Sequence, residues 1–134
     1  TYYPDGSISA KETYKNGQLN GGVISFFPSG RVKGEVCYRD GLKSGKSCEY
    51  YEDGNPCEIA WYENDLRHGQ SNQYYPGGFK KAIGVYKNGK KHGLWIFFRE
   101  DGRMDSEGQF IADEKTGKWK YYTYENGRSS VRLE

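Results

Sequence analysis

The sequence repeats at an interval of 24 residues. One set of glycines keeps this interval without exception, at Gly21, Gly45, Gly69, Gly93 and Gly117. A period between 20 and 50 residues is typical of stacked repeat architectures, in which each unit packs only on its neighbours. The 134 residues are therefore predicted to form one domain of successive units, with approximate bounds 1–20, 21–44, 45–68, 69–92, 93–116 and 117–134.

Two turn signals divide each unit. The first ends in a second set of glycines, as in Pro4-Asp5-Gly6, and the second is an Asn-Gly or Asp-Gly step such as Asn16-Gly17 or Asp40-Gly41. These steps tolerate the positive φ of tight hairpin turns, and the runs between them have the length of strands. No sustained helical apolar stripe is present. We predict an all-β chain, a single elongated twisted antiparallel sheet of tandem hairpins in which each unit advances the sheet by about 10 Å.

Aromatic residues form two further columns at the same interval. The chain has a mean hydropathy of −1.00, so it offers little conventional core, and stacking of rings between units is the expected source of stability. Small residues, among them Ala60, Ala82, Gly84 and Gly108, precede the rings of the second column and leave room for rings to lie flat on the backbone. The predicted stacking residues are Phe26, Tyr50, Tyr74, Phe98 and Tyr122 in the first column, and Tyr14, Tyr38, Tyr62, Tyr86 and Phe110 in the second.

The last two units carry four additional large rings, Trp95, Phe97, Trp119 and Tyr121. Their spacing places all four on one face of the predicted sheet. One interpretation is that they pack on one another or cap the end of the sheet. The other is a partner-binding patch, because Trp and Tyr dominate binding hot spots. The last unit also departs from the period, since Gly127 comes one residue late, and residues 128–134 are expected to form a final strand or to fray.

Composition and charge weaken several classes of function. Lys and Arg number 20 against 18 Asp and Glu, a formal charge of +2 without a basic stripe, so a nucleic-acid partner is not expected. No run approaches the roughly 20 apolar residues that span a bilayer, and no signal peptide is visible. The chain begins at Thr1 without a methionine, so either a leader has been removed or the sequence is a fragment.

Histidines and cysteines were considered as ligands and as bridges. His68 and His92 occupy equivalent positions in adjacent units, about 10 Å apart, too far to share one metal ion at about 2.0–2.1 Å. No metal and no cofactor are expected. If a turn were centred near Leu42 and Lys43, Cys37 and Cys48 would be neighbours able to form a disulfide; the favoured alternative is lone thiols, including Cys57.

Catalytic groupings are not evident. The acidic residues fall mainly in turns, where Asp5, Asp53 and Asp101 have a conformational role, and no phosphate-binding glycine loop is present. An open single sheet would also have difficulty excluding water from a reaction. We therefore do not expect an enzyme.

The segment YKNGKKHGLWIFFREDGR, residues 86–103, resembles a MORN repeat, and the 24-residue spacing with paired aromatics resembles the variant repeat of bacterial YwqK-family antitoxins. The resemblance implies a non-catalytic protein-interaction module that neutralises a protein toxin, in the bacterial cytoplasm, or in the cell envelope or secreted if a leader preceding Thr1 was removed. The alternative is a scaffold or lipid-surface module, motivated by basic residues near the turns. These are Lys43, Arg67, Lys90 and Lys91. Unpaired edge strands leave the oligomeric state open.

Overall fold

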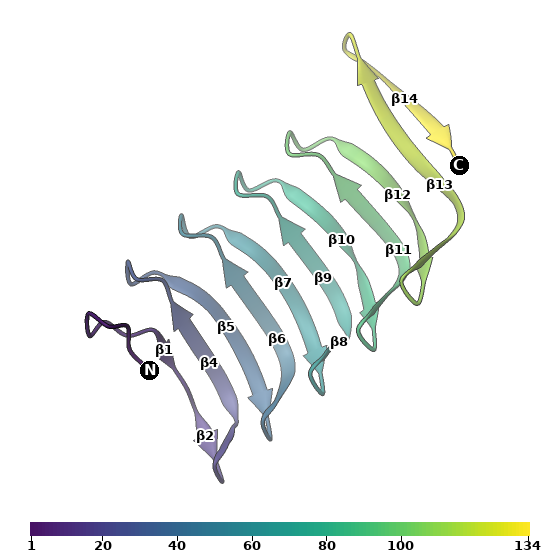
Figure 1. Ribbon diagram of the computed structural model, residues 1–134. Coiled ribbons are helices and arrows are strands. Elements are labelled where there is room, and N and C mark those ends of the chain that lie inside the picture. The colour runs from purple at the N-terminus through teal and green to yellow at the C-terminus, as the bar shows by residue number, and fades with distance from the viewer.

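The computed structural model describes residues 1–134 as one long antiparallel sheet of hairpins without a helix, which confirms the predicted fold class (Figure 1). The strands follow one another along the sheet in sequence order, from β1 to β14. β8 pairs with β7 beside this path, and β2 and β3 form a separate two-stranded sheet. The strands are β1 (Ala10–Lys11), β2 (Tyr14–Lys15), β3 (Gln18–Leu19), β4 (Gly21–Phe26), β5 (Val32–Arg39), β6 (Leu42–Tyr50), β7 (Pro56–Glu63), β8 (Leu66–Arg67), β9 (Gly69–Tyr74), β10 (Lys80–Lys87), β11 (Lys90–Phe98), β12 (Met104–Ile111), β13 (Glu114–Glu125) and β14 (Arg128–Leu133).

The sheet has two faces, and no second layer covers either of them (Figure 1). We call face A the side that carries Trp95 and Phe97, and face B the side that carries Ile96 and Phe98. Side chains alternate between the two faces along each strand. Register then assigns the neighbouring strands, because residues directly opposite each other share a face: Gly108 lies opposite Trp95, and Ser106 lies opposite both Phe97 and Tyr121.

The second turn of each unit has positive φ at both central residues, as at Asn88 (50°) and Gly89 (83°). This geometry matches the right-handed twist of the flanking strands. Asp65 and Asp113 adopt it too, with φ of 69° and 70° in place of glycine. Their carboxylates accept hydrogen bonds from the backbone amides of Lys43 (2.6 Å) and Lys91 (2.7 Å) in the preceding turn. These bonds between turns offset the conformational strain of a side chain at positive φ.

The cysteines show how the unit-joint glycines change the register. The turn is centred on Asp40-Gly41, and Gly45, with φ of 98°, introduces a bulge between the pairs Tyr38–Lys43 and Val36–Ser47. Cys48 therefore lies opposite Glu35 and not opposite Cys37. All three cysteines are free, so the suggested Cys37–Cys48 disulfide is absent because its assumed turn was misplaced and a bulge intervenes.

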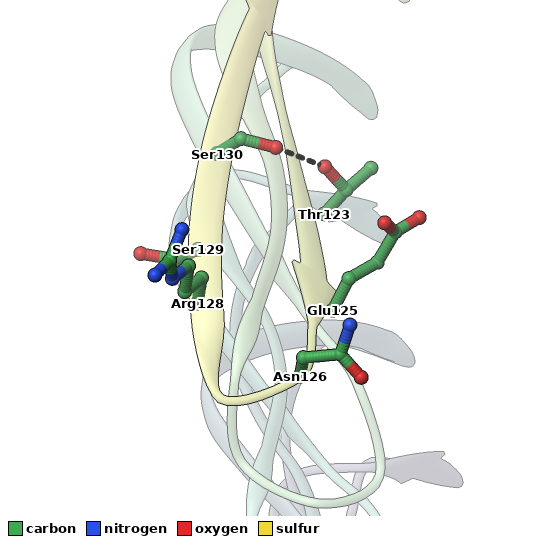
Figure 2. Close-up of a pocket in the computed structure, with 6 residues that line it drawn as sticks. All are labelled: Thr123, Glu125, Asn126, Arg128, Ser129 and Ser130. Carbon is green, nitrogen blue, oxygen red and sulfur yellow. Dashed lines mark hydrogen bonds between the residues drawn. The ribbon is translucent and has the colours of Figure 1, made fainter.

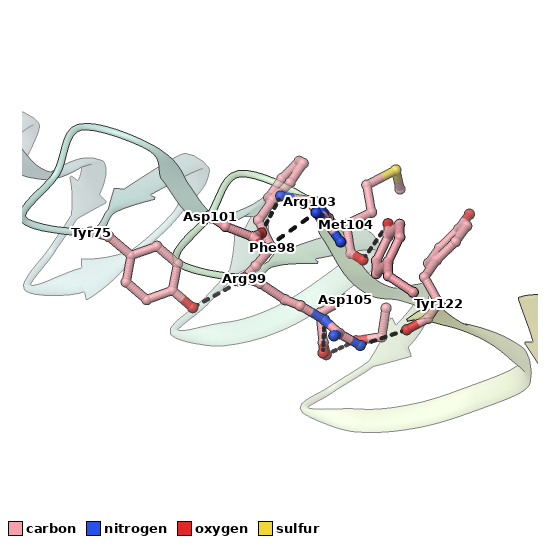
Figure 3. Close-up of polar contacts among 10 residues, drawn as sticks. Tyr75, Phe98, Arg99, Asp101, Arg103, Met104, Asp105 and Tyr122 are labelled. Atoms are coloured by element: carbon pink, nitrogen blue, oxygen red, sulfur yellow. Dashed lines mark hydrogen bonds and ion pairs between the residues drawn. The ribbon is translucent and has the colours of Figure 1, made fainter. Parts of the chain in front are cut away.

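Polar side chains near the first turns tie each unit to the next. The hydroxyls of Tyr51 and Tyr75 donate to the carbonyl oxygens of Tyr74 (2.6 Å) and Phe98 (2.8 Å), and Tyr3 donates in the same way to Phe26. Arg99 takes the tyrosine position in the next unit, and its Nη2 donates to the carbonyl of Tyr122 at 2.7 Å (Figure 3). Phe27 occupies this column as well, but its side chain has no donor.

Phe27→Tyr is expected to stabilise the chain by about 0.5–1.5 kcal/mol, because the new hydroxyl can reach the carbonyl of Tyr50 as its equivalents do. Tyr75→Phe should destabilise it by a similar amount. Urea unfolding measures both effects, with Tyr2→Phe as a control because Tyr2 is 73% exposed. Equal stability of the wild type and both variants would contradict this role for the hydroxyls.

The core of the chain is a ring cluster on face A of the last units. Trp95, Phe110, Trp119 and Ala82 are buried, with Tyr86, Phe97 and Tyr121 packed against them. A Cβ atom added to Gly84 would lie 2.1 Å from Cδ2 of Trp95, and one added to Gly108 would lie 2.4 Å from Cδ2 of Trp119. The expectation that these glycines make room for rings to lie on the backbone is therefore confirmed.

Rings of the same column do not stack on one another. Equivalent residues are two strands, or about 10 Å, apart, whereas interacting rings have centroids about 4.5–7 Å apart. Tyr86 and Phe110 instead meet Trp95 and Trp119 edge-on, at 5.1 Å and 5.0 Å. The expected stacking along a column is not what holds the units together for the remaining members, Tyr14, Phe26, Tyr38, Tyr50, Tyr62, Tyr74, Phe98 and Tyr122.

Candidate functional site

The four candidate partner-binding rings come together on face A, but two of them are inaccessible. Trp95 is 0% exposed and Trp119 is 2% exposed. Their Nε1 groups donate to the backbone carbonyls of Val85 (3.0 Å) and Gln109 (3.2 Å), which fixes both indoles flat against the sheet. This corrects the prediction that the indoles offer a contact surface: glycines beneath them make them core residues. Phe97 and Tyr121 remain half-exposed at the surface of the cluster.

A column of cations runs across the strands on face A. Its four members are 24 residues apart, and each lies opposite a ring of the second aromatic column in its own hairpin. We call them the cation row. The pairs are Lys43 with Tyr38, Arg67 with Tyr62, Lys91 with Tyr86, and Lys115 with Phe110.

Each cation in the row also lies over a ring that follows it in the chain. Lys43 Nζ is 5.0 Å from the ring centroid of Tyr62, and Arg67 Cζ is 5.3 Å from that of Tyr86. Lys91 Nζ lies 5.2 Å from the ring of Phe110 and 5.4 Å from the indole of Trp95. Lys115 Nζ lies 4.4 Å from the indole of Trp119. These distances are in the range of cation–π attraction, which holds the charged ends on face A.

Only Arg67 in the row has an acidic partner. Its Nη2 lies 2.6 Å from Oε1 of Glu58, and its Nε donates to the hydroxyl of Tyr62 at 3.2 Å. Burial, reinforced by the charge of Glu49, raises the pKa of Glu58 although Arg67 opposes the shift. Burial would lower the pKa of Arg67, but the bond to Tyr62 and the charge of Glu58 outweigh it and raise that pKa. Arg67 thus stays cationic.

Arg67→Met is expected to raise the pKa of Glu58 further, because the half-buried carboxylate loses its counter-charge and still faces Glu49. A carboxyl with a raised pKa favours folding below its unfolded value and loses that contribution as the pH rises through its folded value. The variant should therefore lose more stability near pH 7 than near pH 4. NMR titration and urea unfolding measure this, with exposed Arg39→Met as the control; equal losses at both pH values would contradict it.

Sequence reasoning found only part of this row. It named Lys43, Arg67 and Lys91 but missed Lys115, which continuing the 24-residue interval would have found. It also included Lys90, which lies opposite Lys87 and by alternation belongs to face B. The bulges at the unit joints conceal this difference, because the face of a residue cannot be assigned from its distance to the turn alone.

The histidines do not form a metal site. The Nδ1 of His68 accepts a hydrogen bond from the backbone amide of Asn88 at 3.2 Å, so this ring links successive turns. His92 is exposed opposite Val85. No group of three or more His, Cys, Asp or Glu side chains lies close enough to hold a metal ion.

Concave regions of the surface are shallow. A pocket of about 540 Å³ lies in the β13–β14 hairpin and is lined only by polar residues (Figure 2). Within it the hydroxyls of Thr123 and Ser130 bond to each other at 2.5 Å. Its lining contains no histidine or cysteine. The pocket thus offers no hydroxyl paired with a histidine of the kind used in nucleophilic catalysis.

Comparison with known families agrees with the fold. The model of the MORN repeat variant matches residues 1–16 and 43–64. The longer match spans most of β6 and all of β7, which is one two-strand unit. No curated protein matches the chain, and no helix in it has the length and hydrophobicity needed to cross a membrane. MORN repeats suggest a scaffold that binds proteins or membranes. The matched segments and the continuous sheet of hairpins together support a MORN-repeat protein built from the variant form of the repeat.

Proposed function

We propose that this chain is a non-catalytic module that binds a protein partner on face A. The observation that carries the proposal is the cation row, in which Lys43, Lys91 and Lys115 are oriented over rings and form no ion pair within the chain. Half-exposed Phe97 and Tyr121 lie in the same region. Positive charge beside aromatic surface suits recognition of a protein, since interfaces are enriched in aromatic residues and use charge complementarity for specificity.

The more specific form of the proposal is a bacterial antitoxin or immunity-type protein. It is supported by the resemblance of the 24-residue units and their paired aromatics to the YwqK family. Neutralisation would then be steric, because a rigid sheet laid over a toxin blocks access without any reaction. Co-expression with a toxin encoded beside this gene tests this form: growth should be restored by the wild type and lost again with Lys91→Glu.

Site-specific photo-crosslinking in the source cell tests the general proposal. A benzophenone amino acid at position 97 is expected to crosslink to one protein partner, whereas the same group at position 98, on face B, is not. Phe97 and Phe98 are both half-buried neighbours on β11, so the comparison controls for position along the chain. Crosslinks of equal yield from both positions, or from neither, would contradict binding on face A.

A lipid surface is the second candidate, and the cation row is the observation that favours it. Basic residues near an anionic membrane are each worth about 1 kcal/mol, and their effect is screened by salt. Flotation with phosphatidylserine vesicles at low and high salt tests this candidate. Binding that is strong at low salt and requires the anionic lipid would support it, and absence of flotation at low salt would remove it.

A further inference from the structure

The partner of face A can be described further, on the basis of the protein-binding function proposed above. We infer that it presents an α-helix with an acidic residue at about every seventh position, which lies across the strands along the cation row. The cation row of Lys43, Arg67, Lys91 and Lys115 is the site, and the carboxylates of the helix are its ligands.

The spacing of the row is the first argument. Successive members are two strands apart, or about 10 Å at about 4.8 Å per strand. In an α-helix seven residues rise by about 10.5 Å and complete nearly two turns, so they return to the same side of the helix. An extended segment covers about 10 Å in three residues, and an odd interval places successive side chains on opposite sides. A helix therefore matches the row, and a strand does not.

The charge of the row is the second argument. Lys43, Lys91 and Lys115 are each held on face A by a ring, so little conformational freedom is lost when an anion binds them. Asp65 and Asp113 lie in the neighbouring turns, but their carboxylates accept hydrogen bonds from backbone amides and form no ion pair with these lysines. Three cationic sites in fixed positions are thus available to a partner.

Arg67 makes the row unequal. Its guanidinium already pairs with Glu58 at 2.6 Å and lies near the hydroxyls of Tyr62 and Tyr86. A carboxylate of the helix placed there would have to compete with Glu58. The acidic residue that meets Arg67 should therefore contribute least to binding, and the one that meets Lys91, beside half-exposed Phe97, should contribute more.

Two designed peptides test the inference on the full chain. Both are alanine-rich helices of about four heptads with the same composition; the first places glutamate at every seventh position, and the second distributes the glutamates around the helix. Trp61→Phe is used as background, so that fluorescence reports Trp95 and Trp119 beneath the row. The first peptide should bind at least about 10-fold more tightly, since about 1.4 kcal/mol gives this factor.

Matched variants separate the row from general positive charge. Lys91→Glu with Lys115→Glu should weaken the first peptide at least about 10-fold, whereas Lys90→Glu with Lys118→Glu, which changes the same charge on face B, should not. Lys43→Glu, outside the ring cluster, should weaken it even if the double variant proves unstable by circular dichroism. A peptide with lysine at every seventh position should recover binding to the charge-reversed row.

The outcomes are distinct. Equal affinity for the two peptides, or binding that survives Lys43→Glu and the double reversal, would overturn the inference. Flotation with anionic vesicles without binding of either peptide would assign the row to lipid and overturn it as well. If the peptides fail while the benzophenone at position 97 still crosslinks a protein, the helical partner is wrong but the protein-binding function remains. Loss of the crosslink too would remove both.

Discussion

Gly84→Ala is expected to destabilise the chain by about 3 kcal/mol, at the upper end of the usual effect of overpacking. The new methyl group would lie 2.1–2.2 Å from Cδ2 and Cε2 of Trp95. The indole cannot withdraw easily, because its Nε1 is bonded to the carbonyl of Val85 and its ring is fully buried. Urea unfolding followed by tryptophan fluorescence measures the effect, and a midpoint equal to that of the wild type would contradict the packing described above.

The repeat supplies controls for this substitution. Gly22→Ala places a methyl group where nothing lies within 4 Å, so it should leave stability nearly unchanged. The pair equivalent to Gly84 and Trp95 in the preceding unit is Ala60 and Ser71. Gly84→Ala combined with Trp95→Ser recreates that pair, and the double variant should be destabilised by less than the sum of the two single changes, since the clash disappears with the indole.

Trp95→Ala is expected to destabilise the chain by about 3–5 kcal/mol, the usual loss for a buried aromatic ring. The ring contacts Tyr86, Phe97 and Phe110 and is 0% exposed, so its removal opens the cluster on both sides. Any loss of partner binding should accompany unfolding. The matched control is Trp61→Ala on face B, where the indole is 45% exposed; this change should have a small effect.

A folded Trp95→Ala variant with unchanged stability but lost partner binding would contradict the core role of this residue. That result would instead restore the interpretation of the indole as a contact residue. Thermal unfolding and partner crosslinking on the same preparation separate the two cases.

Much of the fold could be predicted because each turn has a local cause. Asn-Gly and Asp-Gly steps adopt positive φ wherever they occur, and the glycines of the first turns do the same, as Gly102 shows with φ of 91°. Asp101 illustrates why acidic residues belong there, since its Oδ1 accepts a hydrogen bond from the amide of Arg103 at 3.0 Å. A strict interval then extends these local preferences to the whole sheet.

The candidate site was harder to predict, because it depends on register and burial. A bulge at each unit joint moves residues such as Cys48 relative to the opposite strand, and turn chemistry alone does not show how far. The shared face of Trp95 and Phe97 followed from alternation. Their different exposure did not, because it depends on Gly84, which lies beneath one ring and not the other.

The central claim is that the units are laid side by side in sequence order in one layer. Double electron–electron resonance tests it with spin labels at Asp5, Asp53 and Asp101, equivalent turn positions, in a chain whose three cysteines are replaced. Each step of two units should span about 19 Å, so the Asp5–Asp101 distance should be close to twice either shorter one. A longest distance no greater than the shorter two would show that the sheet closes on itself and would contradict the account.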